Sequence, residues 1–134
     1  MYQFNYKKVE TIQEAVDELT TNPDSKILAG GMTLIPTMKQ RLASPEKLID
    51  IRNIEELNFI REESNNIIIG STTNHFNVSS SDLIKEKIPS LSMLAEGIGD
   101  PHVRNMGTIG GAISNNDPTA DYPAACLGLG AKIK

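Results

Sequence analysis

Two glycine-rich segments carry the residues most able to bind a ligand through the backbone. The first reads AGGMTLIP at residues 29–36, and the second reads GTIGG at residues 107–111. Glycine allows left-handed dihedral angles and leaves backbone N–H groups uncovered. Successive N–H groups of this kind can form a concave nest around an anion. Two nests in one small domain predict a ligand with two phosphates, such as a dinucleotide.

Neither segment carries a standard nucleotide fingerprint. The G-x-G-x-x-G spacing is absent from residues 29–36, and no Gly-Lys-Ser/Thr follows them. A tight turn, in which glycine only meets a steric need, is the alternative interpretation of this first segment. The second segment has three glycines in five residues, which is poor helix or strand material. The glycines of this second segment are best explained by a close approach of their backbone to a ligand.

An acidic stretch follows the second segment. Asp121 could accept hydrogen bonds from the hydroxyls of a sugar or polyol. Alternatively, it caps a helix that begins at Tyr122, with Pro123 at an early helical position. Asp117 precedes Pro118 and is expected to be a turn residue.

The elements that position the first segment follow from its flanks. Residues 11–14 read as a capping box, and the helix that they open ends at Asn22-Pro23. Residues 26–29 predict a strand that runs into the first glycine pair, and Thr33 can cap a second helix whose apolar stripe extends to Leu42. Residues 48–51 alternate like another strand. The opening half therefore predicts a β-α-β-α-β order that closes near residue 53.

The second half predicts a different arrangement. Residues 59–61 and 67–69 are strand candidates joined by a polar hairpin loop at 62–66. Helices are expected over residues 82–87 and 122–129. Another is expected after Pro89 and carries Leu91, Leu94, Ala95 and Ile98, whereas 97–104 reads as irregular. Residues 131–134 look like the start of a strand. Interrupted hairpins and helices after an α/β opening predict an α+β architecture.

Composition narrows the function classes. The chain has 134 residues, a net charge of −4 and no apolar run near the length of a membrane span. An acidic balance argues against nucleic acid as a partner. No signal-peptide core is present, which predicts a cytoplasmic location. The single cysteine, Cys126, is expected to be a buried structural thiol. His75 and His102 are expected to be surface or hydrogen-bonding residues rather than metal ligands. Three cations, Lys39, Arg41 and Arg104, are expected to be solvated, though one could reach a phosphate.

Taken together, the two glycine segments and their flanks resemble a known family. The segments ILAGGMTLIP at 27–36, SPEKLIDI at 44–51, IGDPHVRNMGTIGG at 98–111 and NDPTADYP at 116–123 resemble the flavin-binding motifs of the FAD subunits of molybdenum hydroxylases. These are the medium subunits of aerobic carbon monoxide dehydrogenase and of the xanthine dehydrogenase family. Two long motifs in the same order are far more specific than one glycine pair.

The resemblance implies a PCMH-type FAD-binding fold with a small α/β subdomain at residues 1–53 and a larger α+β subdomain at 54–134. It also implies no catalytic acid or base and no metal ligand. The cofactor-binding residues that it implies are Leu28, Ala29, Gly30, Gly31, Met32, Thr33, Leu34, Ile35, Ile98, Gly107, Thr108, Ile109, Gly110, Gly111, Ala112 and Asp121. Ala112 and Met32 replace residues that are often polar in the family, so only their backbones are expected to contact FAD polar groups.

The implied function is electron transfer by an oxidoreductase flavoprotein subunit. A molybdopterin-binding large subunit and a 2Fe-2S small subunit would be its partners, and FAD would pass electrons to NAD or another acceptor. Family subunits have a C-terminal domain that these residues do not include, so the chain is expected to be a fragment. The alternatives are a truncated, non-catalytic module that binds FAD or a nucleotide and, less favoured, a stand-alone FAD reductase.

Overall fold

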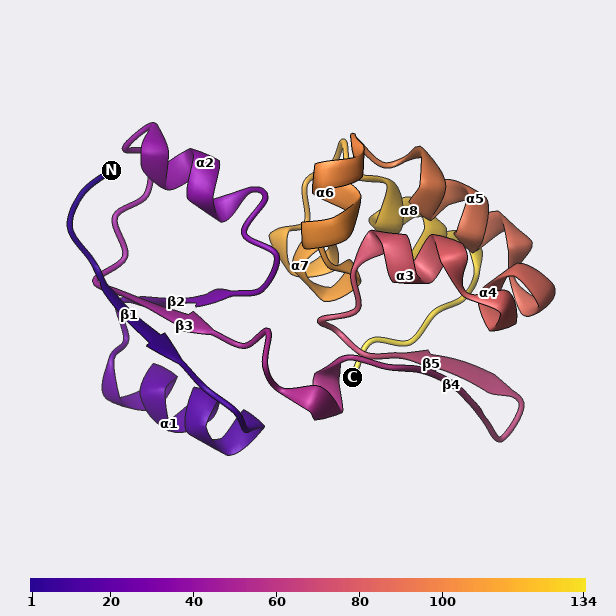
Figure 1. Ribbon diagram of the computed structural model, residues 1–134, viewed down its shortest axis with the longest axis horizontal. Helices are drawn as coiled ribbons and strands as arrows, with labels where there is room; N and C mark the ends of the chain where they lie inside the picture. The colour runs from indigo at the N-terminus through magenta and orange to yellow at the C-terminus, as the bar shows by residue number, and fades with distance from the viewer.

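The computed structural model describes residues 1–134, which form two units, each with its own sheet (Figure 1). In the first unit, the strands β1 (Asn5–Lys8), β2 (Ser25–Leu28) and β3 (Lys47–Asp50) form a parallel sheet in the order β1-β3-β2. Helix α1 (Ile12–Thr21) follows β1, and α2 (Leu34–Lys39) follows β2. The predicted β-α-β-α-β order is confirmed.

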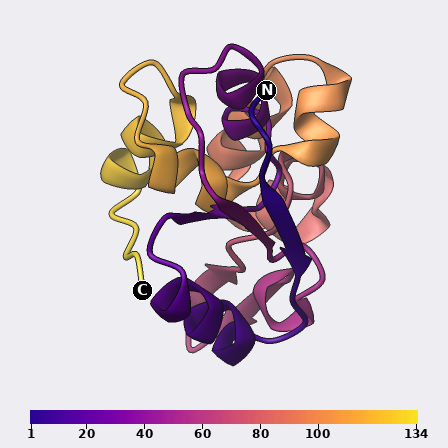
Figure 2. The same cartoon turned by 90° about the vertical axis from the view of Figure 1, so that its left-hand side faces the viewer.

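The two helices cover opposite faces of this sheet. Leu48 packs with Met38 of α2, whereas its neighbour Ile49 packs with Ala15 of α1. Adjacent residues of a strand point to opposite faces, so β3 is buried on both sides as the central strand. Figure 2, turned by a right angle, shows α1 and the sheet from the side. Helix α2 ends at Lys39, so Leu42 is 75% exposed and the predicted stripe through Leu42 is wrong.

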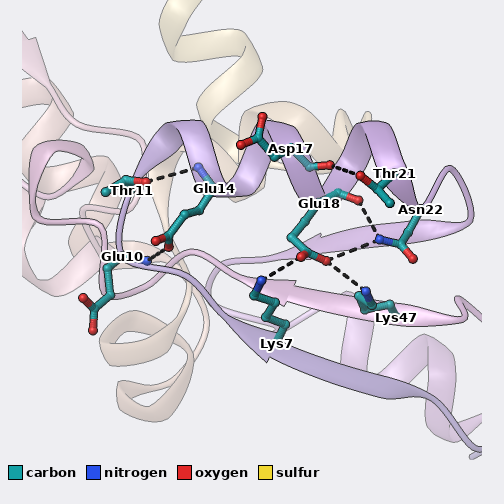
Figure 3. Close-up of polar contacts among 9 residues, drawn as sticks. All are labelled: Lys7, Glu10, Thr11, Glu14, Asp17, Glu18, Thr21, Asn22 and Lys47. Atoms are coloured by element: carbon teal, nitrogen blue, oxygen red, sulfur yellow. Dashed lines mark hydrogen bonds and ion pairs between the residues drawn. The ribbon is translucent and has the colours of Figure 1, made fainter.

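Helix α1 has the predicted cap (Figure 3). The Thr11 hydroxyl accepts from the Glu14 N–H at 3.1 Å, and the Glu14 carboxylate accepts from the N–H of Glu10 at 2.9 Å. One turn further, Glu18 bridges Lys7 of β1 at 2.7 Å and Lys47 of β3 at 2.9 Å. These pairs fasten the helix across two strands.

The second unit begins with the short 3₁₀ helix η1 (Glu55–Leu57) and the antiparallel hairpin of β4 (Ile60–Glu63) and β5 (Asn66–Ile69). Its turn is shorter than the predicted loop 62–66. Ser64 and Asn65 both have positive φ, at 49° and 64°, as a two-residue hairpin turn requires.

Six helices complete the second unit. They are α3 (His75–Ser80), α4 (Asp82–Lys87), α5 (Pro89–Gly97), α6 (Pro101–Met106), α7 (Ile109–Asn115) and α8 (Asp121–Gly128). They enclose a larger core of Val78, Ile84, Leu91, Ala95, Ile109 and Tyr122. None of the helices has the length and hydropathy needed to cross a membrane.

Three sequence expectations fail in this unit. Residues 97–104 were predicted irregular, but α6 begins at Pro101, because the Asp100 side chain accepts from the Val103 N–H and Pro101 suits the first helical turn. Gly110 and Gly111 lie in the first turn of α7, and their amides donate to the Ser71 carbonyl and the Thr108 hydroxyl. Residues 131–134 form no strand.

Candidate functional site

The first glycine segment connects β2 to α2 at the carboxyl end of the parallel sheet (Figure 1). The N–H groups of residues 29–34 have no acceptor within the chain, and the first bonded amide is that of Ile35, which donates to the Gly31 carbonyl at 3.0 Å. Thr33 occupies the N-cap position of α2, yet its hydroxyl makes no capping bond. Six consecutive donors and one hydroxyl are thus available to a ligand.

The side chains of this segment divide into two groups. Leu28, Leu34 and Ile35 pack into the small core beneath α2. Met32 and Thr33 are exposed, and Gly31 has a φ of +75° that a residue with a side chain rarely adopts. The predicted site residues Leu28, Ala29, Leu34 and Ile35 can therefore serve a ligand mainly through the backbone.

The second glycine segment uses its amides differently. Its N–H groups already donate to acceptors of the protein, except that of Thr108, which has none. The expectation of a second bare nest is therefore wrong, because the fold itself occupies these donors. The bonds run from Gly107 to Val103 O at 2.7 Å, from Ile109 to Thr73 O at 3.0 Å, from Gly110 to Ser71 O at 2.9 Å, from Gly111 to Thr108 Oγ1 at 3.1 Å and from Ala112 to Thr108 O at 3.0 Å.

The two segments nevertheless meet. A Cβ placed on Gly30 would lie 2.1 Å from the Met106 carbonyl oxygen and 2.7 Å from the Gly107 Cα. Backbone therefore touches backbone, and only glycine allows that approach. The loop before α2 lies against α6 and α7 in Figure 1. The two glycine segments therefore lie in direct contact.

The segment at 71–75 was missed by the sequence interpretation. A Cβ on Gly110 would lie 2.5 Å from the Ser71 carbonyl oxygen, and one on Gly107 would lie 2.6 Å from His75 Nε2. The glycines of the second segment are therefore needed to pack against residues 71–75. The one available signal was Asn74, whose side chain caps α3 by accepting from the Asn77 N–H.

His75 and Tyr122 lie behind the second segment. The His75 side chain is buried, against the expectation of a surface or hydrogen-bonding residue, and its Nδ1 has no partner. Its ring centroid lies 5.3 Å from that of Tyr122, whose buried hydroxyl also has no partner. Burial lowers the pKa of His75 below 6.5, and the charge of Asp121 offsets part of that effect. Burial likewise raises the pKa of Tyr122.

The remaining predicted positions are spread around this centre. Asp121 is the first residue of α8 rather than its cap, and it is exposed. Ile98 is half-buried at the end of α5 and packs against the larger core. Asp117 accepts from the N–H and the hydroxyl of Thr119, which confirms it as a turn residue.

Of the cations, Arg104 is half-buried rather than solvated. Its Nη1 donates to the carbonyl oxygens of Ile98 and Gly99, each at 3.1 Å. Cys126 is half-buried, and burial raises the pKa of its thiol. No cluster of three His, Cys, Asp or Glu side chains lies at metal-binding distance.

A fully buried carboxylate stands beside the first segment. Asp50 ends β3 next to Leu28 of β2, and the Ile51 N–H donates to the Leu28 carbonyl at 3.0 Å. The Asp50 carboxylate accepts from the Tyr6 hydroxyl and from Arg52 Nε and Nη2. Burial alone would raise the pKa of Asp50, but these hydrogen bonds outweigh it and hold the pKa at about 2.

This geometry fits a diphosphate at the first segment. Phosphate oxygens are strong acceptors that suit successive backbone N–H donors. Comparison with known proteins adds a match of residues 2–134 to the family described as the FAD binding domain in molybdopterin dehydrogenase. The chain belongs to this family. The predicted resemblance, the α+β FAD-binding fold and FAD as the cofactor of the family are confirmed.

Relatives in the family share the whole of this domain. The chain is 43% identical over 131 residues to the glyceraldehyde dehydrogenase medium chain of Sulfolobus acidocaldarius, covering 98% of this chain and 47% of that one. It is 44% identical to the carbon monoxide dehydrogenase medium chain of Afipia carboxidovorans, covering 96% and 45%. A solved carbon monoxide dehydrogenase from Hydrogenophaga pseudoflava superposes with a TM-score of 0.92 at 44% identity, covering 94% and 44%. The chain thus spans about half the length of these relatives.

Proposed function

We propose that this chain supplies the FAD-binding part of an electron-transfer subunit in a molybdenum hydroxylase. The row of free N–H groups at residues 29–34 carries this proposal, together with the meeting of the two glycine segments. The relatives named above are medium chains of dehydrogenases, which supports an oxidoreductase role. The bound flavin would supply the electron-transfer chemistry, and the chain's residues would bind and orient it.

Different residues would bind different parts of the cofactor. The amides of 29–34 and the Thr33 hydroxyl would hold the diphosphate. From the second segment, the free Thr108 N–H and the backbone of Gly111 and Ala112 would border the cofactor. The exposed Asp121 carboxylate would accept hydrogen bonds from its hydroxyl groups. The proposed site keeps all the positions predicted from the sequence: Leu28, Ala29, Gly30, Gly31, Met32, Thr33, Leu34, Ile35, Ile98, Gly107, Thr108, Ile109, Gly110, Gly111, Ala112 and Asp121.

The partners belong to the same proposal. A molybdopterin-binding large subunit and a 2Fe-2S small subunit would deliver electrons, and NAD or another acceptor would receive them. We further propose that residues 1–53 and 54–134 are two FAD-binding subdomains joined near the end of β3. The cytoplasmic location stays a prediction from the sequence.

A binding module without a catalytic role is the second candidate. The concentration of free donors on one segment favours it, because a single nest suits the diphosphate that ADP and FAD share. Parallel titrations with FAD and ADP separate the two. Binding of FAD much more tightly than ADP supports the flavoprotein, whereas equal affinities support the module.

The test of the site uses a charge placed at the nest. The Thr33→Glu variant puts a carboxylate beside the proposed diphosphate, and we expect FAD affinity to fall at least about tenfold. Gln40→Glu adds the same charge at the other end of α2 and should leave the affinity near that of the parent chain. FAD binding is followed by fluorescence quenching and by absorbance at about 450 nm. Equal losses in both variants, or no binding by the parent chain, would refute the proposed site.

A further inference from the structure

We propose that His75 is a positioning residue whose neutral imidazole holds the second glycine segment against the first. It would act on the cofactor only through the backbone of that segment. Its effect on FAD rests on the function proposed above, whereas its effect on the segment itself is independent of any ligand.

The segment at 71–75 runs along the backbone of residues 105–110 and fastens it at successive points. The Asn74 side chain donates to the Asn105 carbonyl at 3.0 Å, and the His75 N–H donates to the Gly107 carbonyl at 3.1 Å. Asn74 also forms an isolated antiparallel bridge with Thr108. The amides of Ile109 and Gly110 donate back to residues 73 and 71. The second glycine segment is thus held from one side by hydrogen bonds.

The His75 ring fills the space beneath Gly107. His75 is only 5% exposed, and a Cβ built on Gly107 would lie 2.6 Å from the His75 Nε2 atom. Tyr122 of α8 supports the other side of the ring at a centroid distance of 5.3 Å. Gly107 in turn touches Gly30 of the first segment. His75, Gly107 and Gly30 therefore form a continuous stack from the larger core to the first segment.

The charge of the His75 imidazole is the one property of this stack that a change in pH would alter. Asp121 of α8 is the one charged side chain that acts on the imidazole, and it is exposed. Tyr122 adds a buried hydroxyl without a partner, and the second segment presents only the backbone of Gly107. A proton on His75 would place a positive charge in this buried setting. Burial opposes that charge, since the pKa of His75 lies below 6.5. Protonation should therefore push the ring away from Gly107.

The ligand-free chain tests the positioning itself. Amide hydrogen exchange of Ile109 and Gly110 reports whether their bonds to residues 73 and 71 persist, and protection factors remove the intrinsic effect of pH. We expect the parent chain to lose protection as the pH falls below 6.5, with the midpoint at which the His75 imidazole titrates by NMR. His75→Gln should lose this dependence, whereas His102→Gln, at an exposed histidine, should keep it. Protection that ignores the titration of His75, or a His75→Gln variant with the parent pH dependence, overturns the proposal. The NMR comparison on the parent chain holds even where His75→Gln does not fold.

FAD affinity gives the second readout. If only the neutral form holds the site, the apparent dissociation constant should rise about tenfold for each pH unit below the pKa of folded His75. His102→Gln should follow the same profile, and a folded His75→Gln variant should bind FAD weakly at every pH with a flat profile. A parent chain that binds no FAD at any pH refutes the proposed function, while the exchange experiment still decides the role of His75. FAD binding with a flat profile in the parent chain refutes the positioning role alone.

Discussion

The two glycine segments have similar composition but opposite hydrogen bonding. At residues 29–34 the amides have no acceptor within the chain, whereas at 107–112 only that of Thr108 lacks one. The first segment follows β2, an edge strand of the parallel sheet, and its donors meet no acceptor of the chain. The second lies against residues 71–75, which use its donors one by one.

This difference shows that glycine serves two physical purposes here. In the first segment, Gly31 adopts a left-handed φ at the turn between β2 and α2. In the second, the glycines at 107 and 110 lack a Cβ because His75 and Ser71 stand where it would be. A glycine pattern therefore indicates close approach, but it does not reveal whether a ligand or the protein itself approaches.

The contact between the segments gives the largest expected effect. Gly30→Ala would force a Cβ against the Met106 carbonyl and Gly107, and neither backbone can move without disturbing α6. We expect a loss of about 3 kcal/mol in the free energy of unfolding, measured with urea. Gly97→Ala is the matched control, because nothing lies within 4 Å of its Cβ. A Gly30→Ala variant as stable as Gly97→Ala would show that the two segments do not touch.

The buried carboxylate beside the first segment should give the next largest effect. Asp50→Asn removes a charge that four hydrogen-bond donors of Tyr6 and Arg52 stabilise, and we expect a loss of about 2 kcal/mol near neutral pH. The pKa of Asp50 is lowered from 3.8 to about 2. Its contribution is therefore complete above pH 3.8 and is lost as the pH falls toward 2.

Urea unfolding between pH 2 and 7 checks this window. The stability of the parent chain should fall between pH 3.8 and 2 more steeply than that of Asp50→Asn. The lowered pKa of His75 adds a decline in stability that begins as the pH falls below 6.5, and both proteins share it. Parallel slopes for the two proteins at the acid end would argue against this role for Asp50.

Tyr6 in the first unit and Tyr122 in the second differ in whether their hydroxyl group has a hydrogen-bond partner. Tyr6→Phe removes a hydrogen bond to Asp50 and should cost about 1.5 kcal/mol. Tyr122→Phe removes a buried hydroxyl without a partner and should be neutral or stabilising by about 0.5 kcal/mol. Thermal unfolding of both variants measures the difference. A clear loss in Tyr122→Phe would show that its hydroxyl has a bonding partner in solution.

The two threonines that precede helices give the smallest expected effect. Thr108→Ala removes an acceptor for the Gly111 N–H and should cost about 1 kcal/mol of stability. The Thr33 hydroxyl makes no capping bond, so Thr33→Ala should leave the stability of the ligand-free chain unchanged. FAD binding should reverse the order, with Thr33→Ala weakening affinity more. Equal stability losses would mean that Thr33 also caps its helix.

Much of the fold could be predicted because its signals are local. The capping box of Thr11 and Glu14 predicted the start of α1, and Asn22 and Pro23 predicted its end. The alternation of apolar and polar residues at 48–51 predicted the central strand. The helix at 101–106 was missed, although Asp100 and Pro101 are a standard helix start. The strand expected to start at 131–134 is absent from the structure.

The candidate site could be predicted only in part. Family membership followed from the two motifs and their order, and it is confirmed. The contact between the glycine segments is a finding of the tertiary structure. The assignment of individual residues to FAD stays a prediction. Residues 71–75 and the burial of His75 carried almost no signal, because their partners lie about thirty residues away in the sequence and nothing local reports such a contact.

The sequence by itself determined which backbone positions are free of side chains and in what order they occur, because the absence of a Cβ is a property of the residue type. Only the tertiary structure decided which of those positions keep free donors. A backbone N–H is occupied or free according to what the rest of the chain brings within about 3 Å of it, and that depends on packing between distant segments. The same glycine pattern therefore became an open row of amides beside β2 and a closed packing surface beside α3.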